Sequence, residues 1–314
     1  MRLASLLFFV ISSAARAQDS FTRDLQAGVD FIQNGRYRDA LEPLTRAAAV
    51  RPDDFEPHYL LGLALSQEGR PGEALRHLRA GRRGRPSHVG LLTLLAVLYL
   101  REGYPLDAAE TFESAARQSP LAEKSALLIA EAWHQCFQFD KALASAVETA
   151  ARFPRSADAK FRLGFELETA GRFDEAQSAF AGAVELRPEF VEAHIALARL
   201  ERLGARYESA RQHLEIALRT RPNDRAARIE LAKLLVGRKQ HAEARQLLVT
   251  LISETDTEPE LHLLLARIYQ GEGDAPATAR ERARFLELSR GEHSSGGMSG
   301  TVPSRKTRRF ADSN

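Results

Sequence analysis

Three histidines recur at one interval and are the first candidates for chemistry. His58, His194 and His262 are separated from one another by multiples of 34 residues. Imidazole is a common zinc ligand, but a zinc site needs three or four side chains that converge on one ion. If each 34-residue segment is one stacked unit, His194 and His262 lie two units apart, too far to share a metal. We therefore expect these histidines to be partly buried packing residues and predict no metal site.

Other sequence patterns for catalysis or cofactor binding are missing. Cys136 is the single cysteine, which rules out an intramolecular disulfide and a cysteine-based zinc site, and we expect it to be a buried free thiol. The chain has no HExxH, no GxxxxGK and no dinucleotide-type glycine loop. We predict no catalytic residues and no cofactor. An unrecognised hydrolase or transferase is kept as an alternative.

The histidine interval belongs to a repeat that covers most of the chain. Segments of 34 residues begin at residues 21, 55, 89, 123, 157, 191 and 225, without insertion or deletion, and an eighth begins near 259. Position 20 is alanine in the first seven segments, from Ala40 to Ala244. Position 32 is proline in the first six, from Pro52 to Pro222, and Asp256 in the seventh. Position 8 is always glycine or alanine in these seven, and position 15 is glycine in segments 1, 2, 3 and 5.

This pattern of recurring residues predicts a helical hairpin in each segment. Positions 4, 7, 8 and 11 lie on one stripe of a first helix, and positions 20, 24 and 27 lie on one stripe of a second. Small residues at positions 8 and 20 allow the two helices to approach closely, and larger residues at position 24 fill the space beside them. Glycine at position 15 ends the first helix, and proline at position 32 ends the second. One hairpin cannot bury its apolar face alone, so the segments must stack.

These residues resemble the tetratricopeptide repeat (TPR) family over residues 21 to about 290. Segment 5 is the closest match, with Leu163, Gly164, Leu167, Gly171, Phe173, Ala176, Phe180, Ala183 and Pro188 at the signature positions. Segment 4 departs from the pattern at Phe137, and segment 7 lacks both the glycine and the proline. The resemblance implies an all-α fold, a right-handed α-solenoid of helix-turn-helix units whose first helices line a concave groove.

In the TPR family, positions 2, 5, 9, 12 and 13 of the first helix point into that groove. The expected groove residues are apolar in the first three segments and more polar and charged in the later ones: Leu25, Val29, Tyr59, Leu63, Val97, Leu100, Glu131, His134, Phe161, Phe165, Glu168, Arg199 and Arg202. We expect Tyr59, Leu63 and Val97 to hold apolar side chains of a peptide, Phe161 and Phe165 to form an aromatic platform, and Arg199 and Arg202 to fix an acidic end. Packing against a neighbouring segment is the alternative for some of these residues. The lysine and asparagine by which chaperone-binding TPR domains hold a terminal carboxylate are replaced by Leu25, Val29, Tyr59 and Leu63.

The two ends of the chain predict export and a disordered tail. Residues 1–17 have Arg2, an apolar run from Leu3 to about Ala15, and a small-x-small site at residues 15–17, as in a signal peptide cleaved after Ala17. The apolar run is shorter than the ~20 residues of a spanning helix, which argues against the alternative of a membrane anchor. Residues 291–314 are polar and basic, and we expect them to be disordered.

The charge distribution argues against nucleic acid as a partner. The first seventeen residues and the tail from Gly291 each carry +2, so residues 18–290 carry −2 of the total +2. A nucleic-acid-binding protein needs a basic face. The arginines from Arg76 to Arg85 and the basic tail are expected to be solvated; docking to an acidic protein or anionic lipid is the alternative. Membrane contact would be peripheral.

The sequence thus predicts an exported, non-enzymatic scaffold with a protein or peptide ligand. We expect the exported protein to be periplasmic if it comes from a bacterium, and otherwise secreted. The alternatives are a self-associating structural component, such as a homodimer joined through the apolar strip, and the unrecognised enzyme above.

Overall fold

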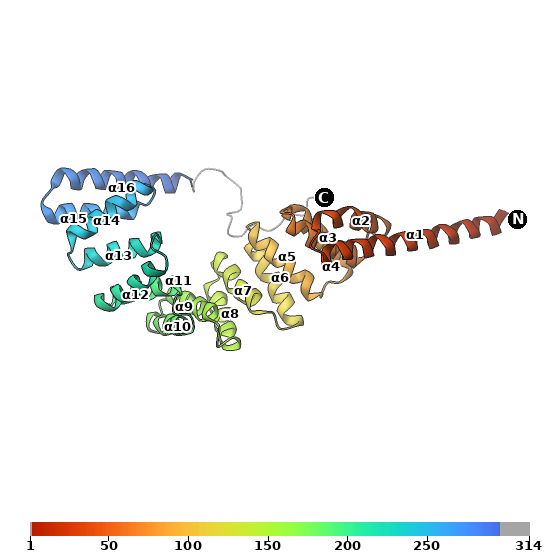
Figure 1. The fold of residues 1–314 in the computed structure, drawn as a ribbon, viewed down its shortest axis with the longest axis horizontal. Helices are drawn as coiled ribbons and strands as arrows, with labels where there is room; N and C mark the ends of the chain where they lie inside the picture. The colour runs from red at the N-terminus through yellow and green to blue at the C-terminus, as the bar shows by residue number, and fades with distance from the viewer. Residues whose placement is uncertain (1, 296–314) are drawn as a thin grey trace. The chain divides into compact units, whose positions relative to one another are not determined.

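The computed structural model describes residues 2–295, with side chains described for residues 18–290. The described chain consists of sixteen α-helices without a β-strand (Figure 1). It divides into two compact units, here called unit one and unit two, with the boundary between Ser145 and Ala146 inside helix α8. The fold is that of an all-α helical repeat, in which each unit is a stack of helical hairpins.

The helices alternate strictly as first and second members of hairpins. The first helices are α1 (Arg2–Gln33), α3 (Phe55–Gln67), α5 (Val89–Arg101), α7 (Glu123–Gln135), α9 (Ala157–Thr169), α11 (Val191–Leu203), α13 (Arg225–Gly237) and α15 (Pro259–Glu272). The second helices are α2 (Tyr37–Val50), α4 (Pro71–Gly84), α6 (Pro105–Gln118), α8 (Phe139–Arg152), α10 (Phe173–Leu186), α12 (Tyr207–Thr220), α14 (His241–Glu254) and α16 (Ala275–Ser295). Each hairpin is called a repeat below, numbered 1 to 8.

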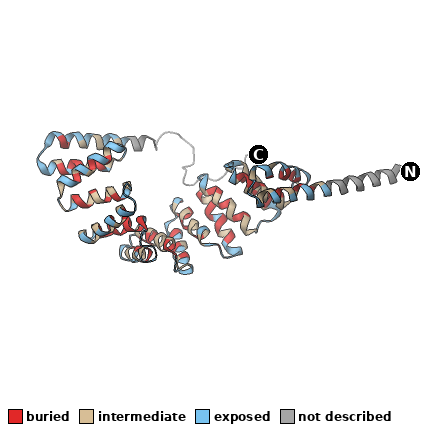
Figure 2. Ribbon diagram, in the orientation of Figure 1, coloured by how far each residue is buried: buried red, intermediate tan, exposed pale blue. Residues whose placement is uncertain are grey.

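The core of unit one runs between the helices of each hairpin and into the next hairpin. Helix α5 is its centre, because the sequence VGLLTLLAVLYLR is apolar on nearly every side and six of its residues are buried. Leu91, Leu95 and Leu98 in this helix are fully buried. In unit two the core is formed by smaller clusters at successive repeats, such as Leu214 with Leu234 and Leu248 with Leu265. Figure 2 shows the buried residues along the contact faces of the helices.

Close packing inside the hairpins depends on the small residues at position 8. A Cβ atom on Gly164 would lie 2.6 Å from ring carbons of Phe180, and one on Gly62 would lie 2.4 Å from Leu78. Phe180 and Leu78 are the position-24 residues of the same hairpins, and both are fully buried. The expected small-against-large contact between positions 8 and 24 is therefore present.

The turn between the two helices of every repeat contains one left-handed residue at position 15. Glycine takes this conformation in repeats 1, 2, 3, 5 and 8, with φ between 71° and 79°. Phe137, Ala205 and Lys239 take it in repeats 4, 6 and 7, with φ of 59°, 57° and 59°. Departure from the glycine signature at these positions therefore leaves the turn unchanged and introduces backbone strain.

The second helices of four repeats end at an arginine that precedes proline. Arg51, Arg85, Arg187 and Arg221 all have φ near −135° and ψ between 81° and 89°. Proline disfavours the helical conformation in the residue before it, which explains this shared geometry. In repeats 2 and 6 the arginine then turns back to position 2 of its own repeat: Arg85 binds Glu56 at 2.7 Å and Arg221 binds Glu192 at 2.8 Å.

The predicted signal peptide and tail fall at the limits of the described chain. The expected cleavage site after Ala17 lies within α1, and the side chains of residues 1–17 are not described. Helix α16 continues to Ser295, and residues 296–314 of the predicted tail lie outside the described residues. Among the described helices, none combines the length and the apolar content needed to cross a membrane.

Candidate functional site

The first helices lie side by side in a layer of their own within each unit. In unit one, α1 contacts α3, α3 contacts α5 and α5 contacts α7; in unit two, α11 contacts α13 and α13 contacts α15. Contacts of similar extent between second helices of adjacent repeats are absent from the described part of the chain. The first helices are therefore closer together than the second helices, so they form the inner side of the stack in each unit.

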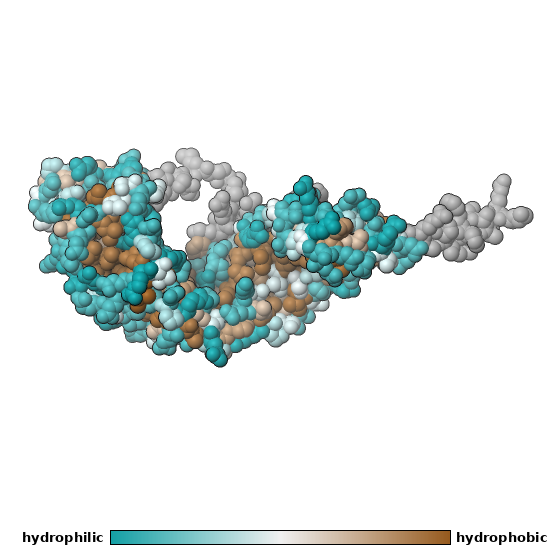
Figure 3. Space-filling view, in the orientation of Figure 1, coloured by the Kyte–Doolittle hydropathy of each residue, from teal (hydrophilic) through white to brown (hydrophobic). Residues whose placement is uncertain are grey.

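The predicted apolar groove residues of unit one are all half-buried on these first helices. Leu25, Tyr59, Val97 and Leu100 pack their inner edges against the core of the unit. Val29 and Leu63 are also half-buried. Figure 3 shows apolar side chains gathered on the visible face over α5 and α6. These six residues, called the apolar strip below, are held in place by the core and still present part of their surface to solvent.

Tyr59 is the most firmly positioned member of the apolar strip. Its ring is stacked on Phe55 with centroids 5.4 Å apart, and it contacts His88 at 5.2 Å. Its hydroxyl lies 3.0 Å from the place that a Cβ on Gly90 would occupy, so glycine at residue 90 leaves room for the phenol. Burial raises the pKa of Tyr59, which keeps the hydroxyl neutral.

Repeat 4 carries polar groove residues and a cluster of aromatic rings. Glu131 accepts a hydrogen bond from Gln135 at 2.8 Å. His134 meets the ring of Phe139 edge-on at 5.2 Å, and Phe137 meets Phe139 at 5.8 Å. Phe137 and Phe139 are both exposed. Phe137 stands where the TPR pattern has glycine, and neither Phe137 nor Phe139 is among the expected groove residues.

The two predicted platform residues of unit two differ in accessibility. Phe161 is half-buried between Phe180 and Phe190, with ring centroids 5.5 Å and 5.0 Å away. It serves as a packing residue at the junction of α9, α10 and α11. Phe165 is half-buried one turn later, and the guanidinium of Arg162 lies 5.4 Å from its ring centroid.

The charged groove residues of unit two form an ion-pair ladder across successive first helices. Arg199 on α11 binds Glu168 on α9 through two hydrogen bonds of 2.9 and 2.6 Å. Burial opposes the charge of Arg199, but the hydrogen bond to Glu168 and the attraction between the two charges outweigh it and raise its pKa.

The ladder continues towards the C-terminus. Arg202 binds Glu230 on α13 at 3.2 Å, and Lys233 binds Glu230 at 3.1 Å and Glu260 on α15 at 2.8 Å. The six residues of the ladder, Glu168, Arg199, Arg202, Glu230, Lys233 and Glu260, have no net charge. Arg199 and Arg202 are therefore already bound to carboxylates of the chain, and an acidic ligand would have to compete with Glu168 and Glu230.

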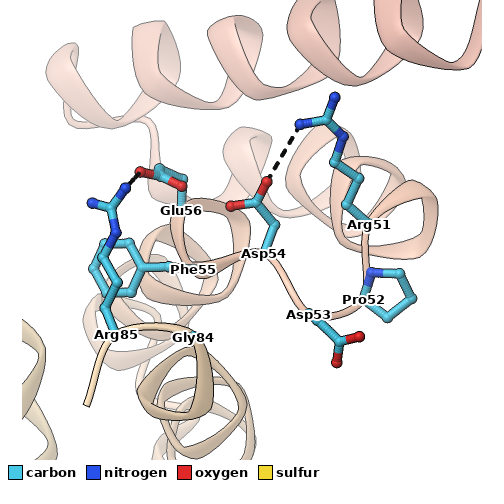
Figure 4. Close-up of a pocket in the computed structure, with 8 residues that line it drawn as sticks. All are labelled: Arg51, Pro52, Asp53, Asp54, Phe55, Glu56, Gly84 and Arg85. Carbon is cyan, nitrogen blue, oxygen red and sulfur yellow. Dashed lines mark ion pairs between the residues drawn. The ribbon is translucent and has the colours of Figure 1, made fainter.

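A shallow pocket of about 460 Å³ lies in unit one beside the loop between α2 and α3. Figure 4 shows that its charged side chains are largely matched: Arg51 pairs with Asp54 at 3.5 Å and Arg85 pairs with Glu56 at 2.7 Å. The guanidinium of Arg85 also lies 4.7 Å from the ring centroid of Phe55. The pocket thus lies where two repeats meet. Arg51 and Arg85, the arginines at position 31, stabilise this junction, so its charged groups already have partners within the chain.

Metal ligands and the single thiol are the remaining candidates for chemistry. Residues 18–290 contain no group of three or more histidine, cysteine, aspartate or glutamate side chains placed to hold a metal ion. Cys136 is buried, and burial raises its pKa, which disfavours the reactive thiolate.

Comparison with protein families matches the repeat pattern to named models. One tetratricopeptide repeat model matches residues 25–89, 59–123 and 166–225, and a second matches residues 205–268. These matches cover more than half of the chain. The chain belongs to the tetratricopeptide repeat family. A search of curated proteins found no significant match.

Several solved structures resemble this TPR chain in fold. A tetratricopeptide repeat protein from Parabacteroides merdae is 17% identical with a TM-score of 0.57, over 80% of this chain and 99% of the other. YrrB, described as a TPR protein with an unusual peptide-binding site, is 21% identical with a TM-score of 0.52, over 60% and 96%. A chain of the APC/C hetero-tetramer Cut9–Hcn1 is 16% identical with a TM-score of 0.57, over 79% and 52%. At these identities the likeness concerns the fold.

The structure brings the predicted groove residues of this TPR chain together as two separate sets. The set of unit one is the apolar strip with Glu131 and His134 near its end, and the set of unit two is the ladder with Phe165. Sequence reasoning missed the acidic partners Glu230 and Glu260 in the ladder. Their signal was present as opposite charges 27 or 28 residues apart, from Arg202 to Glu230 and from Lys233 to Glu260.

Proposed function

We propose that the chain is a non-enzymatic protein–protein interaction scaffold that binds a peptide or protein segment on the first-helix face of its repeats. The apolar strip of unit one is the observation that carries this proposal. Its side chains are positioned by the core, and partly exposed apolar strips on soluble proteins commonly have a partner. The peptide-binding site of YrrB, which shares the fold, is in keeping with such a role.

The chemistry of the strip defines the ligand segment. Leucine and valine side chains favour aliphatic residues spaced along an extended or helical segment, because burial of apolar surface drives the contact. Tyr59 adds a rigid aromatic surface whose ordering costs little entropy on binding. The ladder of unit two is electrically neutral, so a ligand that reaches it would need alternating charges to replace its ion pairs.

Export is the second part of the proposal. The charge and apolar pattern of residues 1–17 supports a signal peptide cleaved after Ala17, which would place the mature protein in the periplasm or outside the cell. Mass spectrometry of protein purified from its own cells tests this. A mature N-terminus at Gln18 is the expected result, and an intact N-terminus would contradict export by cleavage.

A pair of matched variants tests the binding face. Leu63→Asp places a charge in the apolar strip, and Val50→Asp makes the same kind of change at the exposed end of α2, outside the first-helix layer. A photo-crosslinker at residue 97 should capture a partner in the native compartment. We expect Leu63→Asp to abolish this product and Val50→Asp to retain it, with equal helical content in both. Equal capture by both variants would contradict the proposed face.

The same strip could join two copies of the chain, which light scattering distinguishes. A scaffold for another protein stays monomeric over a wide concentration range. A mass that rises with concentration, and that Leu63→Asp returns to the monomer, would identify the chain itself as the partner.

A further inference from the structure

The position-4 histidine of repeat 2 is buried and uses both ring nitrogens. His58 Nε2 lies 2.7 Å from the carbonyl oxygen of Pro52, in the loop that joins α2 to α3. His58 Nδ1 lies 3.1 Å from Nδ1 of His77, at position 23 on α4. The His58 side chain thus ties the preceding loop, the first helix and the second helix together. Figure 4 shows the same loop around Pro52, next to the paired Arg51 and Asp54.

The same arrangement recurs four repeats later, in unit two. His194 Nε2 lies 2.8 Å from the carbonyl oxygen of Pro188, and His194 Nδ1 lies 2.9 Å from Nδ1 of His213. One group is added here. The carboxylate oxygen Oε2 of Glu201 lies 3.8 Å from His213 Nε2, is buried, and has no hydrogen-bond partner.

Repeat 8 keeps the histidine and replaces both partners by carboxylates. His262 Nδ1 lies 2.8 Å from Glu281, again at position 23, and His262 Nε2 lies 2.6 Å from Asp256, at position 32 of the preceding repeat. A histidine donates from both nitrogens only when it is an imidazolium. In the third copy both partners of the histidine are thus acceptors, whereas in the first two copies one partner is a second imidazole.

Hydrogen-bond directions fix how many protons the histidine pairs can hold. A carbonyl oxygen only accepts, so His58 Nε2 carries hydrogen and Nδ1 of the neutral ring accepts from His77 Nδ1. A first added proton goes to the bare Nε2 of His77 and leaves this hydrogen bond intact. A second proton would place hydrogen on both facing Nδ1 atoms and two positive charges at contact distance. The pair must then separate, and the same holds for His194 and His213.

The charged groups around the two pairs differ. Near His77, Glu73 and Arg76 lie on the same helix, and Glu73 is already bound to Arg70 at 2.7 Å. The packed helix α5 approaches this hairpin through the apolar side chain of Leu91, 3.1 Å from the place of a Cβ on Gly81. From the preceding loop, Asp54 is paired with Arg51. Glu73 is thus the nearby carboxylate that favours a proton on His77, and it is shared with Arg70.

Near His213, Glu201 is the charged group that faces the ring. Three other charged side chains around this hairpin are bound elsewhere: Arg187 of the preceding loop to Asp158, Arg211 of α12 to Glu215, and Arg228 of the packed helix α13 to Glu254. A first proton on His213 Nε2 would point at Glu201 and form an ion pair there.

We infer that these three histidine clusters give the repeats a graded response to acid. As the pH falls below about 6.5, the ordinary value for histidine, repeat 2 and the loop before it open first. Repeat 6 opens at lower pH, because Glu201 stabilises the first added proton. Repeat 8 stays closed over this range, because His262 faces two carboxylates, so that an added proton sets no two positive charges against each other. The response is a property of the fold and does not depend on what the first-helix face binds.

The pKa values of both outer histidines are lowered. Burial lowers the pKa of His77, the neighbouring His58 and Arg76 lower it further, and Glu73 acts in the opposite sense. Burial also lowers the pKa of His213, Glu201 acts in the opposite sense, and His194 lowers it further. A lowered pKa in the folded state means that the unfolded chain binds more protons just below the ordinary histidine pKa. The free energy of unfolding therefore falls as the pH falls through that window.

Hydrogen exchange of the full mature chain at pH 7.5, 6.5, 5.5 and 4.5, corrected for intrinsic exchange, measures opening repeat by repeat. The protection of peptides from residues 52–84 should fall about tenfold, which corresponds to one pKa unit. This fall should occur at a higher pH than the fall in peptides from residues 188–220. Peptides from residues 256–285 should stay protected over the same range. Equal loss in all three segments, or loss in repeat 8 first, would overturn the inference.

Matched variants assign the effect to the pairs. In His77→Gln the amide can still donate to His58 but takes up no proton, so the acid response should disappear from repeat 2 alone. His213→Gln should remove it from repeat 6 alone, and Glu281→His should introduce it in repeat 8. An unchanged response in His77→Gln would overturn the inference. Nitrogen-15 spectra of the unmodified protein give an independent reading: at pH 7.5, His58 and His194 should carry hydrogen on Nε2, and the opposite tautomers would contradict the mechanism.

Discussion

Arg199 and Glu168 join two adjacent repeats through a two-pronged ion pair. The guanidinium of α11 donates to both carboxylate oxygens of α9 at 2.9 and 2.6 Å, and the glutamate side chain is only 17% exposed. Two parallel hydrogen bonds fix the relative position of the helices more strictly than a single contact. A pair of nearly identical local geometry exists on the surface of repeat 5, where Arg172 binds Glu175 at 2.7 and 2.6 Å within one helical turn.

A double-mutant cycle should separate these two pairs. We expect a coupling energy of ~1–2 kcal/mol between Arg199 and Glu168, because the pair is partly buried and bridges two repeats. For Arg172 and Glu175 we expect a much smaller coupling energy, because both side chains are well exposed and lie within the first turn at the start of one helix. Urea unfolding of the single and double alanine variants measures both. Equal couplings would contradict a structural role for the ladder.

The left-handed residues of repeats 6 and 7 should be improved by glycine. Ala205→Gly and Lys239→Gly should each raise the free energy of unfolding by roughly 1 kcal/mol, because glycine adopts positive φ without strain. Phe137→Gly should gain less, since it also loses the ring contact with Phe139. Thermal melts provide the measurement. Gly171→Ala is the control at the same position of repeat 5 and should destabilise by a similar amount.

The contact between positions 8 and 24 should tolerate neither growth nor loss. Gly164→Ala would force the ring of Phe180 to move and should cost about 1–3 kcal/mol, as should Ala176→Leu on the facing helix. Phe180→Ala should cost about 3–5 kcal/mol through the cavity that it leaves.

Gly72→Ala is the matched control for Gly164→Ala. Gly72 lies in a helix with no atom within 4 Å of its added Cβ. This change should be neutral or stabilising by up to about 1 kcal/mol. The denaturant concentration at the midpoint of unfolding measures the stability of each variant. A Gly164→Ala variant as stable as the unmodified protein would contradict the contact between Gly164 and Phe180.

Asp256 should contribute a second, more acidic pH dependence. The hydrogen bond from His262 lowers its pKa below the ordinary 3.8, and a hydrogen bond from Arg284 acts in the same direction. A lowered carboxyl pKa stabilises the folded state above the ordinary value, and this stability is lost as the pH falls through the folded pKa. Asp256→Asn should therefore flatten the fall in melting temperature between about pH 5 and pH 3. An unchanged slope would contradict this contribution.

The repeat could be predicted from the sequence because small residues recur at fixed positions of the 34-residue period. Gly164 facing Phe180 and the turn at Gly171 follow directly from their phase in the 34-residue period. Phe137, Ala205 and Lys239 show that the turn persists without glycine, since the packing of the flanking helices determines the backbone there.

The candidate site was predictable in position and less so in chemistry. The apolar strip lies on the first helices because its residues share a helical phase. The expectation that Arg199 and Arg202 are available to bind an acidic ligand left out the carboxylates on adjacent helices. These carboxylates become neighbours of the arginines only when the repeats stack. For the same reason, the period showed that His58, His194 and His262 are equivalent, but it could not show that the position-23 partner is an imidazole in two of these repeats and a carboxylate in the third.

All extensive contacts between the described helices join elements next to each other or one apart along the chain. Closing such short loops costs little entropy, and proteins with this kind of local contact fold rapidly. Each hairpin can thus acquire its shape once its own 34 residues and the following helix have emerged from the ribosome or a translocation channel. Assembly of this chain can accompany its delivery, without waiting for the last residue.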